Sequence, residues 1–94
     1  MPVGFEFIPP QYDHPPKPPM QIIERRLSYD EIQKICAVRS GRALMPGQYF
    51  YGCGGGSLDV RGNCIIWLLE NADDYQRRHE IAHCNGWPGN HPAK

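Results

Sequence analysis

The chain has 94 residues, of which ten are lysine or arginine and ten are aspartate or glutamate, so its formal net charge at pH 7 is zero. This length allows one domain with a modest core, and the balanced charge excludes a strong field for nucleic acid or an anionic membrane. No apolar stretch is long enough to span a bilayer, and no basic region followed by an apolar core marks a secretory signal. We therefore expect a cytoplasmic protein.

Prolines are concentrated at the N-terminal end, where residues 1–19 hold seven of the ten. Because proline fixes φ and lacks an amide donor, residues 9–19 are predicted to be extended, largely as polyproline II. Residues 1–19 then form an arm along a domain of residues 20–94. One alternative is a Pro-x-x-Pro ligand for an SH3-type domain. Another is an arm across the active-site cleft, with Asp13 or His14 near a metal.

Residues 20–27 are predicted to form a strand. A helix follows, because Ser28 and Glu31 have the spacing of a capping box, and Gly41 is its expected end. Apolar residues give this helix a broad apolar side that is predicted to be buried: Ile32, Ile35, Cys36, Ala37 and Val38.

The middle of the chain is predicted to be mainly β-structure. Residues 48–53 are rich in β-favouring aromatic residues, and the glycines of residues 54–56 are predicted to form a loop. Residues 57–60 alternate as in a short half-buried strand, and residues 61–63 fit a hairpin loop. Residues 64–69 are apolar throughout, which predicts a central strand covered on both faces.

Asn71 is predicted to cap a second helix, which runs from about Ala72 to Cys84 or Asn85 and stops at Gly86. The order is then strand, helix, two or three strands and helix. Both helices can pack on one face of a small mixed sheet, which gives an α+β domain.

Four cysteines, Cys36, Cys53, Cys64 and Cys84, are spread through this domain. None belongs to a Cys-x-x-Cys pair, so we do not expect a four-thiolate zinc site. In a reducing cytosol they are predicted to be small buried apolar residues. The alternative is a disulfide between Cys53 and Cys64, which could meet across neighbouring strands.

The run His79-Glu80-Ile81-Ala82-His83 carries the predicted chemistry. On a helix, His79 and His83 lie one turn apart on one face and can bind one metal ion, for which neutral imidazoles favour zinc. Zinc would activate a water and polarise a carbonyl, and Glu80 could act as the general base. This pattern predicts zinc-dependent hydrolysis, most simply of a peptide bond.

The same run resembles the signature of the zincin metallopeptidases, and the layout of residues 20–91 is similar to their N-terminal half-domain. The glycine turn after His83 resembles the metzincin branch, in which a third histidine follows three residues after the glycine. Here that position is Gly89, and the nearest histidine is His91. A wider turn would still bring His91 to the metal. The methionine turn of metzincins has no counterpart after Met45.

The resemblance implies an enzyme that hydrolyses a peptide or protein substrate, with His79, His83 and His91 as ligands of Zn²⁺ and Glu80 as the catalytic base. It also implies a substrate strand paired with an edge strand above the cleft, for which residues 48–53 and 58–60 are candidates. If His91 does not bind, the candidates for the third ligand are His14, Asp13 and a cysteine. The alternative function is an inactive zincin-like binding module, with a structural zinc ion or no metal.

Overall fold

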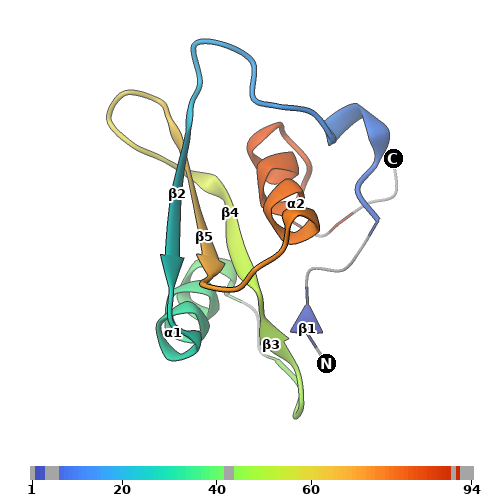
Figure 1. Ribbon diagram of the computed structural model, residues 1–94, viewed down its shortest axis with the longest axis vertical. Helices are drawn as coiled ribbons and strands as arrows, with labels where there is room; N and C mark the ends of the chain where they lie inside the picture. The colour runs from blue at the N-terminus through green and yellow to red at the C-terminus, as the bar shows by residue number, and fades with distance from the viewer. Residues whose placement is uncertain (1, 4–6, 42–43, 90, 92–94) are drawn as a thin grey trace.

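The sheet of the computed structural model consists of β2 (Ile22–Leu27), β5 (Cys64–Leu69) and β4 (Gly52–Leu58), in that spatial order (Figure 1). β5 is parallel to β2 and antiparallel to β4. The structure describes residues 2–3, 7–41, 44–89 and 91. The central place of β5 confirms the strand predicted at residues 64–69, and the α+β class is confirmed with it.

Helix α1 (Tyr29–Ser40) begins and ends where the sequence predicts. The Ser28 hydroxyl accepts a hydrogen bond from the amide of Glu31 and donates one of 3.0 Å to the Glu31 carboxylate. Gly41 closes the helix with a left-handed φ of 62°, a conformation that glycine adopts without steric cost. Local capping chemistry therefore sets both ends of this helix.

The buried side of α1 is narrower than predicted. Ile32 and Cys36, one turn apart, are the buried residues of this helix, whereas Val38 is 84% exposed. A helix that rests on a small sheet covers only one narrow stripe, so the rest of its surface faces solvent. Helix α1 is therefore a surface helix.

Helix α2 (Asp74–Cys84) carries the histidine motif and packs most extensively against β4. Neither helix in the described part of the chain is long and apolar enough to cross a membrane.

All four cysteines form disulfide bonds, which corrects the prediction of buried free thiols. Cys36 of α1 is joined to Cys53 of β4, and Cys64 of β5 is joined to Cys84 of α2, with Cα–Cα distances of 5.6 and 6.0 Å. The predicted alternative, Cys53 with Cys64, is also wrong. Four cysteines allow three pairings, and spacing along the chain does not select among them.

The two helices cover opposite faces of the sheet, which corrects the expectation that both pack on one face. Cys53 is paired in register with Trp67, which stands three residues after Cys64. Because successive side chains of a strand point to opposite faces, Cys53 and Cys64 lie on opposite faces and hold α1 and α2 there. The apolar β5 needs cover on both faces, and one helix on each face supplies it.

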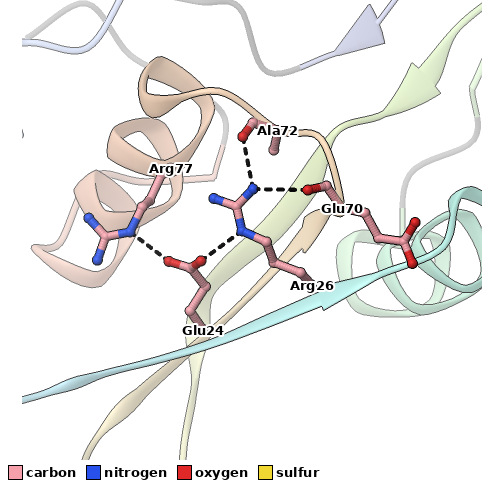
Figure 2. Close-up of polar contacts among 5 residues, drawn as sticks. All are labelled: Glu24, Arg26, Glu70, Ala72 and Arg77. Atoms are coloured by element: carbon pink, nitrogen blue, oxygen red, sulfur yellow. Dashed lines mark hydrogen bonds and ion pairs between the residues drawn. The ribbon is translucent and has the colours of Figure 1, made fainter.

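A polar network joins α2 to β2 (Figure 2). The carboxylate of Glu24 on β2 accepts hydrogen bonds from Arg77 Nε at 2.6 Å and from Arg26 Nε at 2.8 Å. Arg26 also donates to the carbonyl oxygens of Glu70, at 3.2 Å, and of Ala72, at 2.9 Å. Two residues of β2 therefore hold this part of the fold: Glu24 binds the first turns of α2, and Arg26 binds the chain that leads into it.

The glycine run predicted as a loop at residues 54–56 lies inside β4. A Cβ at Gly54 would lie 2.8 Å from Cγ2 of Ile66, its partner on β5. The glycine is therefore needed for close approach between strands and not for a bend. The strand predicted at residues 57–60 ends at Leu58.

The predicted strand at residues 48–53 is divided between β3 (Tyr49–Phe50) and the start of β4. β3 pairs in parallel with β1 (Pro2–Val3), and these two strands form a separate small sheet. The hairpin turn predicted at residues 61–63 is confirmed, because the Asp59 carboxylate accepts hydrogen bonds from the amides of Arg61 and Asn63.

The N-terminal arm lies along α2, on the side away from the sheet (Figure 1). It contains a short 3-10 helix, η1 (Pro10–Tyr12), where polyproline II was predicted. Tyr12 packs against a buried cluster of Ile8, Ala82 and Trp87. The arm therefore helps to enclose α2 between two layers of protein.

Candidate metal centre

The start of α2 is fixed by Asp73, whose carboxylate accepts a hydrogen bond of 2.9 Å from the amide of Gln76. The predicted cap was Asn71. The chain first makes a turn, in which the amide of Ala72 donates to the carbonyl oxygen of Leu69 at 3.0 Å, and the helix begins after it. Because of this turn, the helix is capped by Asp73, two residues after the predicted Asn71.

The structure brings His79, His83 and His91 together, as the sequence predicts. One ligand atom from each of the three residues lies within 4.8 Å of the other two. The ring centroids are 5.0 Å apart for His79–His83 and for His79–His91, and 4.9 Å apart for His83–His91. Two rings come from successive turns of α2, and the third comes from the segment that follows it.

A tight return of the chain places His91 beside the helix. Gly86 has a φ of 103°, and the amide of Trp87 donates to the carbonyl oxygen of Ala82 at 3.1 Å. The amide of His91 then donates to the carbonyl oxygen of Pro88 at 3.0 Å. Two successive turns therefore bring His91 to the other histidines despite the two extra residues before it.

The backbone of Trp87 determines which nitrogen of His83 is protonated. His83 Nδ1 lies 2.8 Å from the carbonyl oxygen of Trp87, and a carbonyl oxygen can only accept a hydrogen bond. Nδ1 of neutral His83 therefore carries the proton, and Nε2 keeps its lone pair. A carbonyl on the outer nitrogen is the usual means by which proteins orient a metal-binding histidine.

The Trp87 side chain forms a wall of the cluster. It is 2% exposed and stacks on His83, with centroids 4.9 Å apart and planes at 11°. It meets His79 edge-on at 5.0 Å. No sequence signal identifies the carbonyl contact, because any residue type could supply it.

The spacing of the three histidines is compatible with binding of one metal ion. Two ligands of a tetrahedral zinc ion at the usual Zn–N distance lie about 3.4 Å apart. His83 Nε2 and His91 Nε2 are 3.1 Å apart, so small movements of the rings would reach that spacing. Three imidazoles also leave a fourth position for a water or a substrate, as in catalytic rather than structural zinc sites.

Glu80 and Gln76 are buried polar residues on the same helix. Glu80 is 3% exposed, and it is not among the three residues whose ligand atoms converge. Gln76 is fully buried, and within the described part of the chain its side-chain amide has no hydrogen-bond partner. A buried unsatisfied amide costs roughly 1–3 kcal/mol, so the helix keeps polar groups here at a cost in stability.

The other candidates for a third ligand are held elsewhere. Asp13 forms an ion pair with Arg78 at 2.5 Å, and the hydrogen bond from Arg78 lowers the pKa of the Asp13 carboxyl. Nδ1 of His14 lies 2.7 Å from the carbonyl oxygen of Pro15, and the four cysteines are in disulfides. The structure therefore does not support an arm whose side chains reach the metal.

The arm is anchored by α2 itself. Nδ2 of Asn85 donates to the carbonyl oxygen of Tyr12 at 2.9 Å and to that of His14 at 2.6 Å. Together with the ion pair between Asp13 and Arg78, these bonds hold the arm on the helix side that carries Asn85 and Arg78.

No protein-family model, curated protein or solved structure matches this chain. The resemblance to zincins therefore depends on the motif, and the site must be judged by its geometry.

Proposed function

We propose that the protein is a zinc-dependent metallopeptidase, in which His79, His83 and His91 bind the metal and Glu80 is the general base. The convergence of three imidazoles on one point is the observation that supports this proposal. The contact between His83 and the Trp87 carbonyl adds to it, because it directs a lone pair toward the same point.

Each residue has a separate role in this proposal. The histidines hold the ion, which when bound supplies Lewis acidity toward a water and a substrate carbonyl. Glu80 takes a proton from the attacking water and passes it to the leaving amine. Trp87 excludes solvent from one side of the histidines, which strengthens electrostatic interactions there.

The proposed substrate is an extended peptide. β4 is an edge strand of the three-stranded sheet, and α2 packs against it. An extended peptide can add to such an edge by main-chain hydrogen bonds. In this proposal, β4 is the edge strand that pairs with the substrate backbone, the role implied by the resemblance to zincins.

The proposed setting is an oxidising compartment and not the cytoplasm. Two disulfide bonds in a small domain are typical of secreted or periplasmic proteins, and are rare where thiols are kept reduced. The cytoplasmic expectation was drawn from the N-terminal sequence and from the lack of an apolar stretch long enough to span a bilayer. Thiol titration of the protein from its native source would test the change.

The decisive experiment combines metal analysis with peptide hydrolysis. We expect about one zinc ion per chain. Glu80→Gln should retain zinc and lose at least about 100-fold in hydrolysis rate, since general-base catalysis supplies that much. His91→Ala should weaken zinc binding, and His14→Ala is its matched control because His14 lies outside the cluster.

Two outcomes would contradict the proposal. If Glu80→Gln hydrolyses peptides as well as the parent chain, Glu80 is not the base. If the protein holds zinc, cleaves no peptide of a library and melts at a lower temperature after chelation, the zinc is structural. The 1% exposure of His79 favours this second function, since a small domain gains stability from an enclosed metal.

A further inference from the structure

A second candidate site lies where β2 and β5 end and α1 begins. It is an open pocket of 530 Å³, a volume typical of small-molecule sites. Its walls include three tyrosines, two leucines and one glutamate: Tyr29, Tyr49, Tyr51, Leu27, Leu69 and Glu70. None of them belongs to the histidine cluster, so the pocket needs an explanation of its own.

The three tyrosine rings are inclined to one another and not stacked. The centroids of Tyr29 and Tyr49 are 5.8 Å apart with planes at 53°, and those of Tyr49 and Tyr51 are 5.3 Å apart with planes at 44°. Inclined rings form a curved wall, which can present more than one π face to a ligand. Tyr29 is 53% exposed, so this wall is open to solvent.

The ring of Tyr51 remains neutral at physiological pH. The hydroxyls of Tyr49 and Tyr51 lie 3.4 Å apart, and the hydrogen bond between them raises the pKa of Tyr51 above its ordinary value of 10.0. Neutral phenol rings have the negative π face that attracts a cation.

Glu70 supplies negative charge at the pocket. Among the residues that the structure describes, its carboxylate has no ion-pair partner. Figure 2 shows it pointing away from Arg26, whose guanidinium is held by Glu24 and by two carbonyl oxygens. Arg26 therefore bonds to other groups and does not neutralise the Glu70 carboxylate. The pocket is lined by this acidic residue as well as by the three tyrosines.

We propose that this pocket binds an organic ammonium group, in the form of a quaternary amine or a methylated lysine side chain. Aromatic faces attract such cations, and the carboxylate of a lining glutamate adds charge complementarity. The two leucines that line the pocket, Leu27 and Leu69, provide apolar contact for the methyl groups. The proposal does not depend on the metal or on peptidase activity.

A titration of the full chain with choline tests the chemistry, with the same metal content in every sample. We expect the methyl proton signal of choline to shift upfield in NMR spectra, because the ring currents of the tyrosines act on it. The neutral carbon isostere of choline, dimethylbutanol, is the matched ligand and should bind at least about fivefold more weakly. Equal binding of the two ligands would overturn the proposal.

Two variants locate the site. Tyr49→Leu and Glu70→Gln should each weaken choline binding by about fivefold, whereas Tyr12→Leu, a tyrosine outside the pocket, should leave it unchanged. If circular dichroism shows that Tyr49→Leu is unfolded, Tyr29→Leu takes its place, because Tyr29 is half exposed on the surface of α1. Unchanged affinity in the folded pocket variants would also overturn the proposal.

A third titration distinguishes the source of the ammonium group. A peptide with a trimethyl-lysine should bind more tightly than choline if the ligand is a modified protein, and more weakly if it is a free amine. The unmethylated peptide is the control. If neither choline nor the trimethyl-lysine peptide binds to the folded wild-type chain, the pocket does not bind this class of cation.

Discussion

The two helices are similar at their ends but differ in what they bury. Each begins at a side chain that caps its first turn, and each is joined to the sheet by one disulfide. Helix α1 buries two residues, Ile32 and Cys36. Helix α2 buries five, three of which are polar: Gln76, His79, Glu80, Ile81 and Ala82.

This difference follows from what covers each helix. Helix α1 touches the sheet with one stripe and faces solvent elsewhere, so it can bury only apolar residues along that stripe. Helix α2 lies between the sheet and the arm, with Arg77 bonded to Glu24 on one side and Arg78 to Asp13 on the other. A helix covered on two sides can keep polar groups in a site with little water, where their interactions are strong. Helix α1 supports the fold, and α2 carries the candidate site.

Removal of the disulfides should have the largest effect and should separate the two helices. The closed loops span 17 and 20 residues, so loop entropy predicts a loss of about 3 kcal/mol of unfolding free energy for each bond. Cys64→Ala with Cys84→Ala should also weaken zinc binding, because Cys84 follows His83. Cys36→Ala with Cys53→Ala is the matched control.

Urea unfolding and zinc titration of the two double variants measure both effects. An equal loss of zinc affinity in both would mean that the disulfides act through the whole fold. The distinction between a supporting helix and a site helix would then fail.

The helix caps offer a smaller test of the same comparison. Ser28→Ala and Asp73→Ala should each reduce the unfolding free energy by about 1 kcal/mol, because each leaves an amide of the first turn without its acceptor. Asp73→Ala should additionally lower zinc affinity, since the first turn of α2 leads directly to His79. Chemical denaturation and zinc titration provide the measurements, with Ser28→Ala as the control. If zinc affinity is the same in both variants, the cap does not position the site.

The features predicted correctly from sequence are those determined within a few residues. Ser28, Glu31 and Gly41 define α1 because capping is a local interaction. The continuous apolar run of residues 64–69 identifies β5 as central for the same reason. To predict that His79 and His83 converge, only the helical repeat was needed. To predict that His91 joins them, it was enough that the glycine turn reverses the chain.

The features that sequence did not predict depend on distant partners. Gly54 is read as a loop residue until Ile66 is placed against it. The cysteine pairs depend on which face of the sheet each helix covers, and this was predicted wrongly. The contact between His83 and the Trp87 carbonyl involves the backbone, so residue identity carries no signal for it.

The smallest effect that we expect concerns the ion pair that holds α2 to β2. Hydrogen bonds from Arg26 and then from Arg77 lower the pKa of Glu24 below its ordinary value of 4.5. A lowered pKa in the folded state stabilises the fold above pH 4.5, and this contribution is lost as the pH falls through the folded value. Because these side chains are partly exposed, Glu24→Gln should cost less than about 1 kcal/mol at pH 7.

The measurement is a double-mutant cycle of Glu24→Gln and Arg77→Gln, followed by urea unfolding at pH 7 and at pH 3. A coupling energy at pH 7 that is smaller at pH 3 would show that the ion pair helps to hold the site helix. Helix α1 is the contrast, since its polar anchor is an uncharged pair of hydrogen bonds between the Gln33 side chain and the backbone of Phe50. A coupling of zero at pH 7 would mean that the disulfide and the core hold α2 alone, because a solvent-screened pair adds nothing to them.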